Sequence, residues 1–345
     1  MYVISHDPAR SDLLPISQEL RKYGTVRQFP AAGSAAVSTV RALRLAGSIA
    51  RGQKQPVSVF FLDAHLLALA IATPLFALLH RGVSGICALG LVGPEAIAGA
   101  SSWRKAVLHR WLARQEVRLY LRTNELAAAW RLAFSAAPEH IGTLPSLEIP
   151  PGESVPASRP EGPTKFGVLG QIRVGKGLEW LVPLFIAHPA LGELHISGNF
   201  FNATQRESLP MVAQFSGFCE RFVRDEELVP TAAAVDYLLV LYDEWDPRLE
   251  AATFFLAARA GRPVICYDSG WCGRMIAEYG CGIAVSTGTR PDAAFFSALP
   301  ARHSPEYERL LQGSGRFRHA HAAETQRGEF LRKVSGVPSG ISQSR

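Results

Sequence analysis

A glycine-rich segment in the middle of the chain carries the residue types that bind phosphate. In residues 165–181 (KFGVLGQIRVGKGLEWL) an apolar run typical of a strand leads through closely spaced glycines into a helical pattern. Glycine lets a backbone approach a ligand closely, and the first N–H groups of a helix favour an anion. Two basic side chains lie among the glycines. The segment therefore predicts a phosphate site that comprises Gly170, Arg173, Lys176 and Gly177.

Two other interpretations of this segment are open. Residues 170–176 read Gly-x-x-x-x-Gly-Lys, which nearly matches a P-loop, and residues 238–244 (LLVLYDE) would supply the acidic strand of such a protein. A P-loop needs Ser or Thr after the Lys to bind Mg²⁺, whereas this chain has Gly177. The other interpretation is a tight strand-to-helix turn whose basic side chains are merely solvated.

The same segment resembles one found in bacterial GT-B glycosyltransferases that build exopolysaccharides. Residues 170–179 match the pattern Gly-x-Ile-Arg-x-x-Lys-Gly-x-Glu of these enzymes. The resemblance implies that Arg173 and Lys176 hold the diphosphate of a nucleoside diphosphate sugar. It covers residues 165–285, where the runs 194–199 (LHISGN) and 215–218 (FSGF) also fit the order of that domain. The nearest relatives look like mannosyltransferases of xanthan-type polysaccharide assembly.

A second matching segment follows at residues 242–265. Thr253 and the run 261–264 (GRPV) match the family, while residues 250–252 (EAA) replace its Asn-Ser-Gly. The resemblance implies that Glu250 accepts the ribose or sugar hydroxyls. The first Glu of the related Glu-x7-Glu pattern would fall at Tyr242, so that pair is incomplete. Arg274, early in the next predicted helix, either reaches a phosphate or is solvated.

The N-terminal half offers few candidates for the base that would deprotonate an acceptor hydroxyl. Asp63 and His65 follow a predicted strand and precede a helix, so we expect Asp63 to act as the base, with His65 beside it. The alternative is that Asp63 caps the helix and His65 is an ordinary helix residue. Relatives often carry a His after the next strand, whereas residues 87–95 (CALGLVGPE) offer only Glu95.

Basic and tryptophan side chains alternate in residues 101–122 (SSWRKAVLHRWLARQEVRLYLR). Rings at headgroup level and guanidinium groups on phosphates suit an anionic membrane surface. Nucleic acid would attract the same charges, and an amphipathic helix with its tryptophans in the core is the structural alternative. We expect membrane contact, since the acceptors of the resembled enzymes are lipid-linked. The residues assigned to this contact are Trp103, Arg104, Lys105, Arg110 and Trp111.

Elements that would position these residues alternate between strand and helix, which predicts doubly wound α/β domains. Predicted strands are 2–5, 57–62, 85–89, 117–122, 166–169, 194–197, 237–242, 264–267 and 283–285, with a hairpin-like return at 215–218. Predicted helices are 14–23, 37–51, 66–79, 103–114, 125–134, 177–186, 249–260 and 272–279. The uncharged run 64–80 approaches the length of a membrane span, but we interpret it as a buried helix.

Length and composition set the domain count. A chain of 345 residues with 48% hydrophobic and 19% charged residues is globular, and it exceeds the size of a single core. Arginine supplies 30 of the 36 basic residues, and the net charge is +6, which suits an anionic partner. Five cysteines without Cys-x-x-Cys spacing indicate free thiols. No signal segment is predicted at the N-terminus.

The sequence thus predicts two Rossmann-like domains that face a cleft. Residues 1–150 would bind the acceptor, 151–164 would form a linker, 165–333 would bind the donor and include closing C-terminal helices, and 334–345 would be a disordered tail. The expected activity is transfer of a sugar, with mannose from GDP-mannose as one candidate, to a polyprenyl-diphosphate-linked oligosaccharide. We expect no metal or cofactor, no nucleic acid partner, and a cytoplasmic location at the inner face of the cell membrane. The alternatives are a P-loop-like nucleotide-binding protein and a non-enzymatic, membrane-associated relative of a glycosyltransferase.

Overall fold

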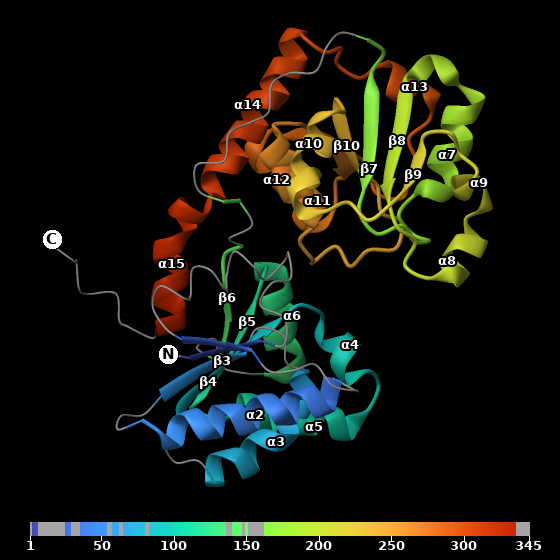
Figure 1. Ribbon diagram of the computed structural model, residues 1–345. Coiled ribbons are helices and arrows are strands. Elements are labelled where there is room, and N and C mark those ends of the chain that lie inside the picture. The colour runs from blue at the N-terminus through green and yellow to red at the C-terminus, as the bar shows by residue number, and fades with distance from the viewer. Residues whose placement is uncertain are drawn as a thin grey trace, which may run out of the picture. The chain divides into compact units, whose positions relative to one another are not determined.

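The computed structural model divides the chain into two compact α/β units. Unit 1 comprises residues 1–150 and 323–345, and unit 2 comprises residues 151–322 (Figure 1). The structure describes residues 2–5, 25–28, 35–53, 57–61, 65–79, 83–135, 140–146, 149–150 and 162–335. Most of the predicted linker, Asp63 and the tail beyond residue 335 therefore lie outside the described residues.

Unit 1 is built on a parallel sheet of six strands. Their order is β2 (Thr25–Gln28), β1 (Tyr2–Ser5), β3 (Val57–Phe61), β4 (Val83–Gly90), β5 (Val117–Leu121) and β6 (Ile141–Thr143). The sequence did not predict β2 and β6. Both lie at the edges of the sheet and have only four and three residues, too few for a recognisable apolar run.

The helices of unit 1 are α2 (Ala35–Arg51), α3 (Leu66–Leu79), α4 (Pro94–Ala98), α5 (Ser102–Leu112) and α6 (Asn124–Phe134). Helix α3 contacts both α2 and α5. No helix among the described residues is long and apolar enough to cross a membrane. Within the run 64–80, residues 66–79 form the predicted helix as α3.

The last helix of the chain, α15 (Ala323–Ser335), belongs to unit 1. Phe330 is fully buried in a cluster with Phe60, Tyr120 and Leu144. The hydroxyl of Tyr120 donates to the carbonyl of Lys333 over 2.5 Å. The predicted donor domain ran to residue 333, whereas unit 2 ends at Ala322, because these apolar side chains anchor α15 on the other sheet.

Unit 2 has a second six-stranded parallel sheet. Its order is β12 (Gly282–Val285), β11 (Val264–Tyr267), β10 (Tyr237–Val240), β7 (Lys165–Leu169), β8 (Glu193–Gly198) and β9 (Phe218–Glu220). Its helices are α7 (Leu178–Ala187), the short η1 (Pro189–Leu191), α8 (Ala203–Ser208), α9 (Pro210–Ala213), α10 (Asp225–Ala233), α11 (Ala252–Ala260), α12 (Gly270–Tyr279), α13 (Ala293–Ser297) and α14 (Pro305–Ala320).

The hairpin-like return predicted at residues 215–218 is wrong. Strand β9 begins at Phe218 and pairs with β8 in parallel, and α8 and α9 form the crossover between them. Parallel neighbouring strands require such a crossover connection. The run 203–213 is polar and contains Pro, so it lacks the apolar spacing that would have predicted its helices.

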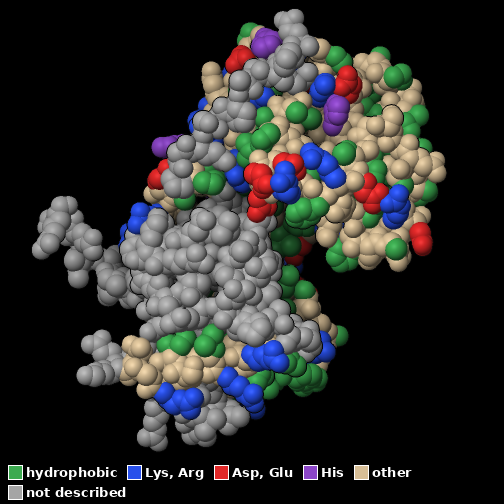
Figure 2. All heavy atoms as spheres, viewed as in Figure 1, with side chains coloured by type: hydrophobic (Ala, Val, Ile, Leu, Met, Phe, Trp, Pro, Cys, Tyr) green, Lys and Arg blue, Asp and Glu red, His purple; other side chains and the backbone are tan. Residues whose placement is uncertain are grey.

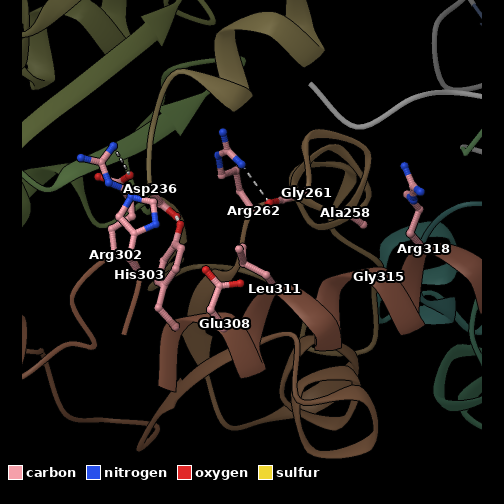
Figure 3. A pocket seen from close by; sticks show the side chains of 11 residues that line it. Asp236, Ala258, Gly261, Arg262, Arg302, His303, Glu308, Leu311, Gly315 and Arg318 are labelled. Atoms are coloured by element: carbon pink, nitrogen blue, oxygen red, sulfur yellow. Dashed lines mark hydrogen bonds and ion pairs between the residues drawn. The ribbon is translucent and has the colours of Figure 1, made fainter. Parts of the chain in front are cut away.

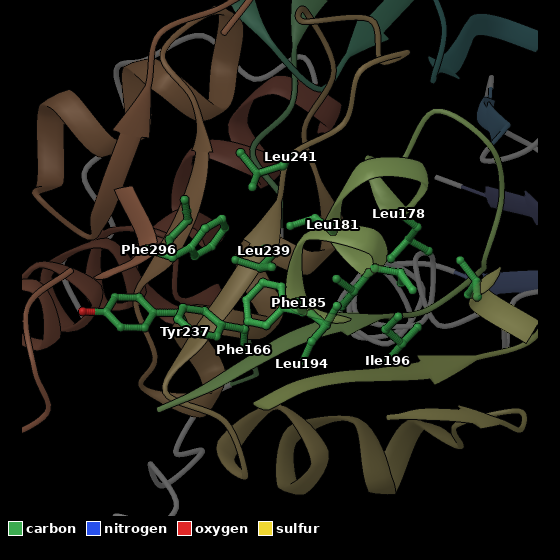
Figure 4. Close-up of a cluster of buried hydrophobic side chains, with 14 of the residues drawn as sticks. Phe166, Leu178, Leu181, Phe185, Leu194, Ile196, Tyr237, Leu239, Leu241 and Phe296 are labelled. Atoms are coloured by element: carbon green, nitrogen blue, oxygen red, sulfur yellow. The ribbon is translucent and has the colours of Figure 1, made fainter. Parts of the chain in front are cut away.

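One core cluster of unit 2 lies between its sheet and a set of helices that includes α7. The central strands β7 and β10 are buried along almost their whole length. Aromatic rings pack edge to face at its centre, with the Phe166 and Phe296 centroids 5.3 Å apart (Figure 4). Helix α7 contributes Leu178, Leu181 and Phe185, which share one helical face. This packing fixes the N-terminus of α7 against the end of β7. Two parallel sheets flanked by helices, one in each unit, confirm the predicted α/β fold class.

Candidate functional site

The predicted phosphate loop joins the end of β7 to the start of α7. Gly170, Gly175 and Gly177 all have positive φ, at +95°, +82° and +75°, so side chains there would strain the backbone. Gly177 is the N-cap of α7, and a Cβ on it would lie 2.3 Å from the carbonyl oxygen of Leu241. Only glycine fits this approach between the loop and the segment after β10.

Hydrogen bonds from neighbouring segments hold the loop in one shape. The N–H of Ile172 donates to the carbonyl of Asn199 over 2.8 Å, and that of Val174 donates to Gln205 Oε1 over 2.5 Å. The N–H of Gly175 donates to Glu179 Oε1 over 2.7 Å. The N–H groups of Lys176 and Gly177, by contrast, have no acceptor within the described part of the chain. Two adjacent donors at a helix N-terminus are thus available to an anion.

The side chain of Lys176 is buried, with 9% of its surface exposed. Its Nζ lies 5.2 Å from the centre of the Tyr242 ring, and Arg173 Cζ lies 5.5 Å from the centre of the Trp245 ring. The two rings are themselves 5.5 Å apart. Burial, and secondly the charge of Arg173, lower the pKa of Lys176 to about 8.

Neither cation of this pair forms an ion pair with a carboxylate of the described residues. A buried ammonium without a counter-charge is costly, and an anion bound at the loop would remove that cost. The arrangement can therefore bind a phosphate or diphosphate and stabilise negative charge on it. The structure brings Gly170, Arg173, Lys176 and Gly177 into one loop, as the sequence predicted.

Tyr242 links this loop to the start of α11. Its buried hydroxyl lies 3.2 Å from Thr253 Oγ1, and burial raises its pKa to about 12, so it remains protonated. Glu250 is half-buried one residue before the N-cap of α11. Sequence reasoning missed Tyr242 and Trp245 as site residues. The aromatic residues in the run 242–247 (YDEWDP) were the available signal.

Arg274 does not join this group. It is exposed on α12. Burial lowers the pKa of His321, and the charge of Arg274 adds to that effect. Burial raises the pKa of Tyr279 to about 12, and the charge of Arg274 opposes that effect. Those residues lie at the end of α14 and the end of α12, so Arg274 faces α14.

A small cavity of about 50 Å³ lies beside the aromatic pair, at the same end of the sheet. Its lining residues include Tyr242, Trp245, Tyr267, Cys266 and Cys272. A hydrogen bond with Cys272, together with burial, raises the pKa of Cys266, so its thiol is protonated and a poor nucleophile. Burial of the Cys266 thiol therefore gives that residue a structural role in the wall of this cavity.

A larger cavity, of about 360 Å³, lies at the opposite end of the unit 2 sheet (Figure 3). Asp236 Oδ2 accepts from the N–H of Lys165 over 2.8 Å, and Arg302 approaches Asp236 Oδ1 within 3.9 Å. Arg262 donates to the carbonyls of Val235 and Ala233. These polar groups tie strand starts to loops, so we assign this cavity a structural role.

Among the predicted catalytic residues, only His65 is described. It is exposed, its N–H donates to Thr39 Oγ1 over 3.0 Å, and its Nδ1 lies 3.3 Å from the N–H of Ala68. For the N–H of Ala68 to donate to Nδ1, the His65 ring must be in the tautomer whose Nδ1 carries no proton. His65 therefore caps α3, in the position that one alternative gave to Asp63. Asp63 itself lies outside the described residues.

The basic–aromatic helix is α5, and its two tryptophans differ. Trp103 is 54% exposed, with Arg104 Cζ 5.6 Å from its ring, and Lys105 and Arg110 are exposed as well. Trp111 is 1% exposed, and its Nε1 donates to Thr73 Oγ1 over 3.1 Å. The assignment of Trp111 to a surface contact is therefore wrong. A helix turns about 100° per residue, so the eight steps between the two rings separate them by about 80°.

Metal-ligating side chains do not gather among the described residues: no group of three or more His, Cys, Asp or Glu lies close enough to hold an ion.

Comparisons with known proteins identify the fold of this chain but no sequence family. No protein-family model and no curated protein matches the chain. The structure of Anabaena Alr3699/HepE in complex with UDP is similar, with a TM-score of 0.72 and 11% identity over 97% of this chain and 99% of that one.

Two other solved structures are similar over nearly their whole length. WaaG, a glycosyltransferase involved in lipopolysaccharide biosynthesis, has a TM-score of 0.67 and 12% identity over 98% of this chain and 100% of that one. Sucrose-phosphate synthase from Thermosynechococcus elongatus has a TM-score of 0.68 and 14% identity over 97% of this chain and 99% of that one. These structures are GT-B glycosyltransferases. The chain therefore has the GT-B fold, two Rossmann-like α/β domains.

Proposed function

We propose that this protein is a glycosyltransferase that uses a nucleoside diphosphate sugar. The observation that carries the proposal is the buried Lys176, which has no carboxylate partner in the described part of the chain and lies beside Arg173 and two free N–H groups. The GT-B fold agrees with this assignment. A diphosphate is the anion that would use both cations and both donors.

The loop would promote the reaction by stabilising the departing group. An acceptor hydroxyl oxygen forms a bond to the anomeric carbon, the bond from that carbon to the diphosphate breaks, and the nucleoside diphosphate leaves. Negative charge grows on the diphosphate as the bond breaks, and Arg173 and Lys176 would stabilise that charge. Glu250, at the start of α11, would accept the ribose or sugar hydroxyls. Asp63 would take the proton of the acceptor hydroxyl.

The donor has two candidates. The sequence resemblance suggests GDP-mannose, while similar structures were solved with UDP and UDP-glucose. For the acceptor we propose a polyprenyl-diphosphate-linked oligosaccharide in exopolysaccharide synthesis, reached from the inner face of the cell membrane. Support comes from the exposed Trp103, Arg104, Lys105 and Arg110. We propose that the reaction needs no metal or cofactor, because the two cations at the loop can balance the diphosphate.

Ligand-dependent melting tests the donor site directly. The protein is melted with UDP, GDP and ADP and with the common nucleotide sugars of each. We expect the ligands of only one base to raise the melting midpoint, because a ligand that binds the folded state stabilises that state. Lys176→Ala should abolish that shift. Lys165→Ala is the matched control. Lys165 is the first residue of β7, at the end of that strand away from the glycine-rich loop, and it pairs with Glu193.

The outcomes separate the alternatives. A shift that persists in Lys176→Ala would contradict the assignment of a phosphate site to this loop. Magnesium-dependent ATP hydrolysis that is lost in Lys176→Ala would favour a P-loop-like protein. Sugar transfer that is lost in Asp63→Asn would exclude a non-enzymatic relative. Donor binding without any transfer to lipid-linked acceptors would favour the non-enzymatic relative.

A further inference from the structure

The outer faces of α2, α3 and α5 in unit 1 carry charge of one sign. None of the three helices contains an Asp or a Glu. They carry six Lys and Arg side chains, all of them exposed: Arg41, Arg44, Arg51, Arg104, Lys105 and Arg110. In Figure 2, blue side chains follow the surface where Figure 1 places α2, with no red side chain among the coloured atoms there.

These six cations have no ion-pair partner in the described part of the chain, unlike many of those in unit 2. Within the described residues no ion pair involves any of the six. In unit 2, by contrast, Arg206 pairs with Glu220, Arg224 with Glu227 and Arg309 with Glu306. Arginines that form no ion pair with the described carboxylates can bind phosphate groups from outside.

Large apolar side chains are exposed on the same three helices. They are Val37 and Val40 on α2, Ile71 on α3 and Trp103 on α5, each exposed by 41% or more. Helix α3 carries no charged side chain and contacts both α2 and α5, so it forms an apolar strip between two cationic helices. We call this surface the three-helix face.

The combination of cations and apolar side chains suits a lipid bilayer. Anionic headgroups would meet the arginines, while Trp103 and the aliphatic side chains would enter the boundary between headgroups and acyl chains. A nucleic acid would use the cations but would leave Val37, Val40 and Ile71 exposed to water. The inner sides of the helices are already occupied, since Leu43, Leu69 and Trp111 are buried in unit 1.

We propose that the three-helix face binds an anionic phospholipid bilayer, with α2, α3 and α5 lying in the plane of the membrane surface. The biological purpose, bringing the acceptor half of the enzyme to a lipid-linked sugar, rests on the proposed function. The binding itself depends only on the charges and apolar side chains of this face.

Vesicle sedimentation with the full chain tests the proposal. We expect binding to phosphatidylcholine vesicles that contain about a quarter phosphatidylglycerol, weakening with salt, and little binding to phosphatidylcholine alone. The variant Arg41→Gln/Arg44→Gln/Arg104→Gln should lose roughly fivefold in partitioning per charge removed, the change that about 1 kcal/mol per basic residue predicts. The control Arg206→Gln/Arg224→Gln/Arg309→Gln removes the same net charge from unit 2 and should bind as the native chain does.

The apolar part of the face has its own control. Trp103→Ala should weaken vesicle binding, whereas Leu132→Ala, at an 86% exposed position on α6, should not. Melting midpoints confirm that each variant is folded. Three outcomes would each overturn the proposal. The first is equal binding to both vesicle types, and the second is an equal loss of binding in the two triple variants. The third is binding to a duplex oligonucleotide that is stronger than vesicle binding and is unchanged by Trp103→Ala.

The two proposals can fail separately. Variants of the three-helix face should keep the melting shift produced by the donor nucleotide, and Lys176→Ala should keep vesicle binding. Vesicle binding without a donor shift would contradict the proposed function alone, while a donor shift without vesicle binding would contradict the three-helix face alone.

Discussion

The ammonium group of Lys176 lies 5.2 Å from the centre of the Tyr242 ring, and the opposite end of that ring places its hydroxyl 3.2 Å from Thr253. Tyr242 thus contacts both the cation of the glycine-rich loop and the first turn of α11. The ring supports the positive charge through its π face in a buried setting where water does not. Tyr242 occupies the place that the related sequence pattern gives to a glutamate.

Changing Tyr242 should separate the effects of its ring and its hydroxyl. Tyr242→Phe keeps the ring under Lys176 and should cost about 1 kcal/mol of unfolding free energy, with donor affinity within about twofold of the native value. Tyr242→Leu removes the ring and should weaken nucleotide binding by about fivefold, as expected for a desolvated cation–π contact. Calorimetric titration with the nucleotide found by melting measures both, and equal affinities in the two variants would refute the role of the ring.

Nucleotide affinity should depend on pH through Lys176. Its pKa is about 8 in the unliganded protein, and a bound diphosphate would favour the charged form and raise that pKa. Between about pH 7 and 8 the ammonium is largely charged and the terminal phosphate is ionised, so affinity should be nearly level. Above about pH 8, binding must take up a proton, so affinity should fall by roughly tenfold per pH unit. Lys176→Arg, which stays charged, should bind without this dependence, and a level profile in the native protein would contradict the prediction.

The stability of the loop should depend on glycine at position 177. Gly177→Ala would add strain at φ +75° and a contact of 2.3 Å with the Leu241 carbonyl oxygen. Gly288→Ala has a similar φ of +85° but open space around the new Cβ, so it measures the strain alone, about 1 kcal/mol. Urea unfolding should show a clearly larger loss for Gly177→Ala, and comparable losses would mean that the approach to Leu241 has relaxed.

Acid should destabilise the protein through His321. Its ring stacks on Phe317, 4.2 Å between centroids, and burial, aided by Arg274 and opposed by Glu278, lowers its pKa from 6.5 to about 4. Between these values the unfolded chain binds a proton that the folded chain excludes. The free energy of unfolding should therefore fall as pH drops from 6.5 to 4, by up to about 3 kcal/mol. His321→Phe should flatten this part of the profile, whereas His188→Gln, at an exposed position in the same unit, should leave the slope unchanged.

The two tryptophans of α5 should respond differently to substitution. Trp111→Ala removes a buried ring and leaves Thr73 without its partner, and it should cost about 3–5 kcal/mol of unfolding free energy. Trp103→Ala should change stability by less than about 0.5 kcal/mol, because the ring is mostly in solvent. Thermal melting distinguishes them, and similar midpoints would contradict the assignment of one ring to the core and the other to the surface.

Local patterns were sufficient for the main elements of the fold. The long apolar runs predicted β3, β7 and β10, because a buried parallel strand is apolar throughout. The short edge strands β2 and β6 gave no such signal. The crossover through α8 and α9 was missed for the same reason, since its short helices bury few apolar side chains.

The sequence by itself determined the glycine-rich loop, because glycines with positive φ and a following helix are local requirements that residues 170–177 meet on their own. It also determined the alternation of strands and helices. Only the tertiary structure decided that Tyr242 lies under Lys176, that Trp111 is buried while Trp103 is exposed, and that α15 belongs to unit 1. Each of these depends on contacts between residues far apart in the chain, and such contacts leave no periodic trace in the sequence around either partner.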